Sequence, residues 1–154
     1  MRYPIFILAV VLAFAASAPG SAITFESIQH GVEIYNSGVE NAPGVVKTLL
    51  GDERIQVEIT RANGTALVAG LETKNALIVN ATEGEIEDPT IVVEAEEGAI
   101  TRVYSSDDPM GAFEEAEKKG EISVRGTTFT TRLKVAAALA STPALRFFAG
   151  LIGK

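Results

Sequence analysis

Residues 108–126 of this 154-residue chain read DPMGAFEEAEKKGEISVRG, a helix signal followed directly by a strand signal. Asp108 is a preferred N-cap residue, Pro109 suits the first helical position, and Gly120 suits the residue after a helix end. Acidic residues come early in the expected helix and lysines come late, which complements the helix dipole. From Glu121 to Gly126, apolar and polar residues alternate with the period of a strand. The stretch therefore predicts a helix and a strand joined at a glycine.

A run of strand signals precedes this stretch. Ile55, Val57 and Ile59 alternate with polar residues, and the pair Asn63-Gly64 favours a tight hairpin turn. Three further runs of strand-forming residues follow, so that the expected strands are 55–60, 65–72, 76–81 and 90–95. Consecutive strands at this spacing predict an antiparallel meander.

Capping residues and helical periodicity predict the remaining helices. A cap at Asn41 begins a short helix over 42–50, and another short helix is expected over 98–104. Thr128 caps a longer helix whose apolar residues recur at helical spacing and are expected to face the core: Phe129, Leu133, Ala136, Ala137 and Ala140. Residues 23–37 are interpreted only as a lead segment. Strands first and helices later predict an α+β fold, with helices packed on one face of a five-stranded, mainly antiparallel sheet.

The N-terminus has the three parts of a secretory signal. A positive charge at Arg2 precedes a short apolar run from Ile5 to Ala18, and small residues follow up to Ala22. The apolar run is shorter than the roughly 20 residues needed to cross a bilayer, which favours cleavage over the alternative of an uncleaved anchor. We expect residues 1–22 to be a signal peptide, residues 23–154 to form one domain, and the protein to be secreted or extracytoplasmic.

Composition argues against several classes of function. The formal net charge is −7, which opposes charge-driven binding to nucleic acid or to anionic lipid. There is no cysteine, and His30 is the single histidine, without a neighbour at metal-ligand or catalytic spacing. Asp107 and Asp108 form an acidic pair, but helix capping already explains Asp108. We expect a protein without enzymatic activity, metal, cofactor or nucleic-acid partner; a small hydrolase is the weakest hypothesis.

Four stretches of the chain occur in the same order in one known family. They are a strand start, a short helix, a second helix and a strand: Asp88-Pro89-Thr90-Ile91-Val92-Val93, Gly98 to Tyr104, Pro109-Met110-Gly111-Ala112-Phe113, and Lys119-Gly120-Glu121-Ile122-Ser123-Val124-Arg125-Gly126. In order and spacing they resemble the sterol carrier protein 2 (SCP2-like) lipid-binding domain family, over about half of the chain. The resemblance implies a five-stranded sheet covered by helices, with an apolar tunnel between the layers that accepts acyl chains or sterols. Glu121 and Ser123 depart from the family, in which lysines are common at these positions.

The implied tunnel must be filled. An empty volume of ~300 Å³ costs on the order of 7 kcal/mol, comparable to the net stability of a whole domain. Our first hypothesis is non-catalytic binding or transfer of a fatty acyl chain or other lipid, and the expected ligand-binding residues are Val68, Ile91, Val93, Met110, Phe113, Phe129, Leu133 and Phe148. The alternative is an exported interaction or structural module whose pocket is filled by its own apolar C-terminal tail. That tail is also a candidate for membrane contact.

Overall fold

The computed structural model describes residues 22–139, 141, 143, 146 and 147, so the signal-peptide prediction and Phe148 lie outside the described residues. The helices are α2 (Phe25–Gly38), the short 3₁₀ helix η1 (Val39–Asn41), α3 (Gly44–Leu49), α4 (Glu97–Ser105), α5 (Pro109–Lys118) and α6 (Phe129–Leu139). The strands are β1 (Arg54–Thr60), β2 (Ala66–Lys74), β3 (Leu77–Glu83), β4 (Ile91–Glu96) and β5 (Ile122–Gly126). Within this part of the chain, no helix has the length and apolar character needed to cross a membrane.

The five strands form one sheet with the order β3-β2-β1-β4-β5. The pairs β1–β2, β2–β3 and β4–β5 are antiparallel, whereas β1 and β4 are parallel. The sheet is therefore mixed, and the predicted meander is wrong at its last step. β4 does not follow β3 along the edge but returns to the other side of β1.

The connection from β3 to β4 explains this return, because it crosses the sheet on the face that carries no helices. Ile86 of this connection lies over β2, where a Cβ atom at Gly70 would come within 2.7 Å of the Cβ of Ile86. The backbone N–H of Ile86 donates to Oε1 of Gln56 on β1 at 3.4 Å. Positive φ angles at Gly84 (108°) and Asp88 (48°) allow the chain to turn at both ends of the crossing. The missing side chain at Gly70 thus makes room for the crossover.

Helix α2 occupies the segment that was expected to be a lead. Its first turn is closed by a capping box, in which Oγ1 of Thr24 accepts from the N–H of Ser27 at 3.3 Å and Oγ of Ser27 accepts from the N–H of Thr24 at 3.1 Å. In most capping boxes the residue three positions after the N-cap is Glu or Gln. Here that residue is Ser27, so the pattern is hard to recognise in the sequence. Ile28 and Tyr35 are fully buried, two helical turns apart on the same face.

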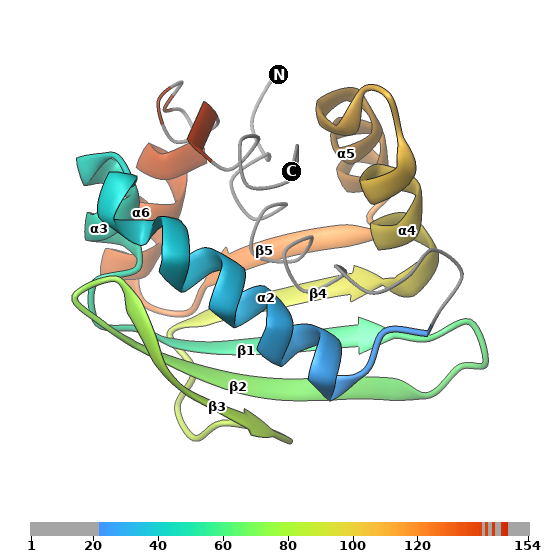
Figure 1. Ribbon diagram of the computed structural model, residues 1–154, viewed down its shortest axis with the longest axis horizontal. Helices are drawn as coiled ribbons and strands as arrows, with labels where there is room; N and C mark the ends of the chain where they lie inside the picture. Colours follow the sequence, from blue (N-terminus) through green and yellow to red (C-terminus); the bar gives the residue numbers. More distant parts are fainter. Residues whose placement is uncertain (1–21, 140, 142, 144–145, 148–154) are drawn as a thin grey trace.

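The helices all lie on one face of the sheet, as predicted (Figure 1). α2 packs on the β3 side of the sheet, whereas α4 packs with α5 near the end of β4, and α3 packs with α6 near the opposite end of the sheet (Figure 1). Apolar side chains of β1 point into this layer, including Ile55, Val57 and Ile59, all of them buried in the core. The molecule therefore has two layers, with one apolar core between sheet and helices.

Candidate functional site

Three of the predicted ligand-binding residues lie in the apolar core between the two layers. Ile91 and Val93 are buried on β4, in register with Ile55 and Val57 of β1, and therefore face the helices. Phe113 is buried on α5 and belongs to the same core cluster. The structure brings these three side chains into one apolar region, and their contact with a ligand stays a prediction.

Val68 does not face this region. On β2 the buried side chains are Leu67, Ala69 and Leu71, so Val68 points to the opposite face, in register with Glu58 of β1. A shift of one residue in a strand exchanges its two faces, and the expected orientation of Val68 was wrong for that reason. The inward positions of β2 that the sequence reasoning missed are Leu67, Ala69 and Leu71. Residues 67–71 carry no polar side chain, so no alternation in the sequence distinguishes the two faces of this strand.

In the first turns of α6, the side chains that point to the core are not the predicted ones. Phe129 is 74% exposed and Leu133 is 56% exposed, whereas Thr131 and Val135 are buried against the rest of the domain. The predicted cap is present, because Oγ1 of Thr128 accepts from the N–H of Thr131 at 3.1 Å. The helix and its start were therefore predicted correctly, and the face turned towards the core was not.

Two further predicted residues cannot be placed relative to the core. Met110 belongs to the first turn of α5, but its side chain lies outside the described part of the chain, as does the whole of Phe148. Their assignment as ligand contacts stays a prediction.

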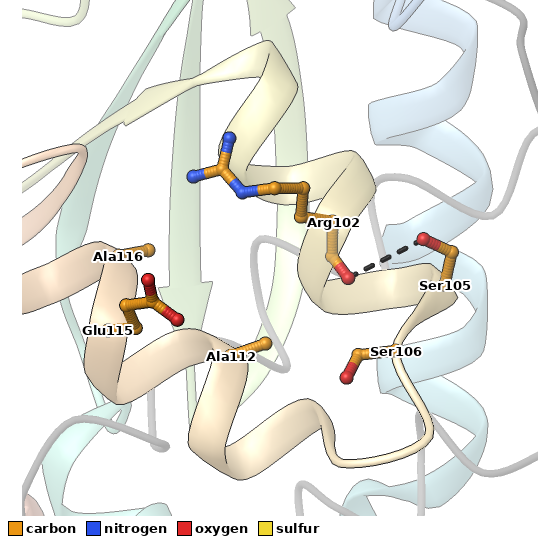
Figure 2. A pocket seen from close by; sticks show the side chains of 6 residues that line it. All are labelled: Arg102, Ser105, Ser106, Ala112, Glu115 and Ala116. Carbon is orange, nitrogen blue, oxygen red and sulfur yellow. Dashed lines mark hydrogen bonds between the residues drawn. The ribbon is translucent and has the colours of Figure 1, made fainter.

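A cleft of about 300 Å³ lies between α4 and α5. Arg102, Ser105 and Ser106 line it from α4 and the residue after it, and α5 contributes Ala112, Glu115 and Ala116 (Figure 2). The sequence reasoning missed this cleft because its lining residues stand singly among residues typical of exposed helix surfaces.

Two charged side chains, Arg102 and Glu115, line the cleft, and each is paired with an opposite charge that is not among the lining residues. Arg102 forms an ion pair with Glu121, and Nζ of Lys119 lies 2.8 Å from Oε1 of Glu115. The hydrogen bond from Lys119 lowers the pKa of Glu115, and the same bond raises the pKa of Lys119. Both serine hydroxyls are engaged locally: Oγ of Ser105 donates to backbone carbonyls of α4, and Oγ of Ser106 accepts from the N–H of Asp108. The cleft can hold a small polar group, but no described residue pairs a serine with a base for nucleophilic catalysis.

His30 and Asp108, two titratable residues considered above as catalytic groups, interact with neighbours on their own helices. His30 is exposed, and its Nδ1 lies 3.7 Å from Oε2 of Glu33 one turn along α2. Oδ1 of Asp108 accepts from the N–H of Gly111 at 3.1 Å, which confirms the predicted cap of α5. Among the described residues there is no group of three or more histidine, cysteine or acidic side chains arranged to hold a metal ion.

Comparison with known proteins supports the fold. No family description and no curated protein sequence matches the chain. Among solved structures, the sterol carrier protein domain 2 of Helicoverpa armigera matches with a TM-score of 0.52 at 14% identity, covering 87% of this chain and 96% of that one. A crystal structure of sterol carrier protein 2 matches with a TM-score of 0.49 at 12% identity, covering 79% and 92%. A UbiJ-SCP2 ubiquinone synthesis protein matches with a TM-score of 0.44 at 16% identity, covering 72% and 85%.

The architecture is thus of the α+β class, with a mixed five-stranded sheet and an apolar layer beneath helices on one face. More specifically, the chain has the sterol carrier protein 2 fold. The resemblance found in the sequence is confirmed at the level of the fold.

Proposed function

We propose that this protein binds or transfers a hydrophobic ligand, a fatty acyl chain or another lipid, between its sheet and its helices. The observation that carries the proposal is the SCP2-like fold, whose match in Helicoverpa armigera is named a sterol carrier protein domain. The apolar inner face of the sheet supplies the kind of surface that such a ligand requires. No charged group has to be engaged, because burial of apolar surface drives binding of this kind.

Ile91, Val93 and Phe113 are the residues through which we propose that the ligand is held. All three are buried and belong to the core between the layers. Hiding ~300 Å² of apolar ligand surface is worth roughly 7 kcal/mol before the costs of association are subtracted. A ligand of this size would therefore stabilise the domain appreciably.

The proposed location is outside the cytoplasm, with residues 1–22 acting as a signal peptide, and the apolar C-terminal tail as a membrane contact. The support for export is the pattern of charge, apolar run and small residues at the N-terminus. Fusion of residues 1–22 to a reporter enzyme that is active only after export tests this part. Reporter activity that is unchanged when the apolar run is replaced by polar residues would contradict it.

Lipid extraction and mass analysis of the purified protein test the ligand. We expect a lipid to be retained by the wild type and to be reduced severalfold in Val93→Phe, because the larger side chain would occupy the volume between the layers that we assign to the ligand. Val92→Phe is the matched control: Val92 is also buried, but it is the next residue along β4 and therefore points to the other face. Absence of any retained lipid, or equal retention in both variants, would contradict the proposal.

A further inference from the structure

The charges of this acidic chain are distributed unevenly along the sequence. Residues 122–154 contain five of the 13 Lys and Arg residues and none of the 20 Asp and Glu residues. This part therefore carries +5, and the preceding 121 residues carry −12. The net charge of −7 conceals a basic region of the sequence, which begins at β5 and includes the whole of α6. On β5, Arg125 is paired with Glu94 of β4 at 3.5 Å, so the unpaired part of this charge has to come from α6 and the residues after it.

Helix α6 also presents an apolar stripe to solvent. Phe129, Leu133, Ala136 and Ala137 are all exposed, and their spacing of three and four residues puts them on one face of the helix. The opposite face is the buried one, where Thr131 packs against the domain. An aromatic side chain that is 74% exposed, next to a leucine that is 56% exposed, forms a surface without a partner in the described part of the chain.

The basic residues of α6 flank this stripe. Arg132 is exposed on one side, and among the described residues its Nε makes a single long hydrogen bond, of 3.4 Å, to the carbonyl oxygen of Gly126. Lys134 lies on the other side, but its Nζ is 2.9 Å from Oε1 of the buried Glu53. Arg132 is therefore the α6 cation that is available to an external anion, whereas Lys134 holds the helix on the sheet.

We propose that α6 docks on an anionic lipid surface, with Phe129 and Leu133 entering the interface and Arg132 meeting the phosphate groups. An apolar stripe bordered by basic residues is the pattern of helices that lie in the plane of a membrane surface. A second copy of this chain is a poorer partner, because two such faces carry charge of the same sign. The net charge alone predicts that binding to anionic lipid is disfavoured. The local excess of basic residues at α6 instead favours such binding at this surface. The inference concerns a surface of the fold and does not depend on a bound ligand.

Vesicle flotation tests this docking with the protein purified in the form that cells produce. The probes are vesicles of phosphatidylcholine alone and of phosphatidylcholine mixed with phosphatidylglycerol. We expect preferential binding to the mixed vesicles, weakened by salt, and reduced roughly tenfold or more in Phe129→Ser/Leu133→Ser, because the interfacial apolar area is lost. Arg132→Glu should weaken binding to the mixed vesicles only.

Val79→Ser is the matched control, since Val79 on the edge strand β3 has the same 56% exposure as Leu133 but lies outside the basic region. It should bind like the wild type. Equal binding of the wild type and the α6 variants, or equal losses with Val79→Ser, would overturn the proposal. Mass analysis of lipid retained by the same variants separates this outcome from a failure of the ligand-binding function, because Phe129 and Leu133 lie on the outer side of α6.

A local reporter keeps the test decisive if the double variant folds poorly. The chain contains no tryptophan, so Phe129→Trp introduces a single indole at the centre of the proposed contact. Its emission should be that of a hydrated indole in solution and should shift to shorter wavelength with mixed vesicles. If the emission does not change at a concentration of mixed vesicles that binds all of the protein, α6 does not enter the interface.

Discussion

Tyr35 shows how one buried polar atom can fix a helix to a strand. Its hydroxyl donates to the carbonyl oxygen of Ala76 at 2.6 Å, in the turn that precedes β3. The next residue, Asn36, pairs its side-chain amide with both the N–H and the carbonyl of Ile78, each at 2.9 Å. These bonds occupy backbone groups at the outer edge of the sheet, where unpaired groups invite association. α2 is thus held on the edge strand by adjacent side chains.

Tyr35→Phe should lower the free energy of unfolding by about 1–3 kcal/mol, because the buried carbonyl of Ala76 loses its donor. Urea denaturation measures the change. Tyr104→Phe is the control: Tyr104 is 37% exposed and should give no measurable loss. Equal stability of Tyr35→Phe and the wild type would mean that the hydrogen bond contributes nothing net.

The same residue predicts a dependence on alkaline pH. Burial raises the pKa of the Tyr35 phenol, so the folded protein holds the phenolic proton more tightly than the unfolded chain does. The resulting stabilisation is complete below the unfolded pKa of about 10, and it is lost as the pH rises from there towards the folded pKa. We expect stability to fall more steeply between about pH 10 and 12 in the wild type than in Tyr35→Phe. Parallel curves for the two proteins would contradict this.

At the scale of elements, the crossover from β3 to β4 depends on the absence of a side chain at Gly70. Gly70→Ala should destabilise the protein by about 1–3 kcal/mol, since its Cβ would press on Ile86 and displace the crossing segment. Thermal unfolding measures the loss. Gly44→Ala is the control, because no atom lies within 4 Å of a Cβ built there and an alanine favours helix α3. A Gly70→Ala variant as stable as the control would show that Ile86 moves away freely.

A second element-scale prediction concerns the attachment of α6. Oε1 of Glu53 pairs with Lys134, and Oε2 accepts from Oγ1 of Thr90 at 2.6 Å, so that one carboxylate links α6 to the start of β4. Lys134→Met removes the cation from a carboxylate that is only 3% exposed and should cost about 1–3 kcal/mol, a value below that of a fully buried pair because Lys134 is 29% exposed. Chemical denaturation measures it.

The double variant Glu53→Gln/Lys134→Met provides the internal check on this pair. It should recover part of the loss, since the amide leaves no uncompensated charge and can still accept from Thr90. If the single and double variants lose the same stability, the ion pair does not couple α6 to the sheet.

Elements with local signals were predicted well from the sequence, and those fixed by distant contacts were not. α5 and β5 are specified by Asp108, Pro109 and Gly120, all within the element or next to it. The partner of β4 is set by the crossover through Ile86, which alternation within β4 does not encode. α2 was missed because its capping box uses an uncommon serine.

The candidate site shows the same division at the scale of the whole molecule. Ile91 and Val93 face the helices, but the outward Val92 between them is just as apolar, so the pattern of β4 does not by itself select the inner face. Val68 likewise required knowledge of which face of β2 meets the helices, and ligand contact stays a prediction for every one of these residues. In α6, periodicity identified the apolar stripe of Phe129 and Leu133 but could not tell that Thr131 and Val135 would form the buried face. The α4–α5 cleft arises only when the two helices pack together.

A chain without cysteine has no disulfide to stabilise it, so a bound ligand should contribute visibly to the stability of the whole molecule. A ligand present at 100 times its dissociation constant stabilises a protein by about 2.7 kcal/mol, which corresponds to several degrees in Tm for a domain of this size. We expect delipidated protein to melt several degrees below protein as purified, and added long-chain fatty acid to restore the difference in the wild type but not in Val93→Phe. Calorimetry measures the change, and a reducing agent, which has no disulfide to act on, should leave Tm unaltered. If delipidation leaves Tm unchanged although extraction recovers lipid, that lipid is bound at the surface, and the proposal of an interior ligand between sheet and helices is wrong.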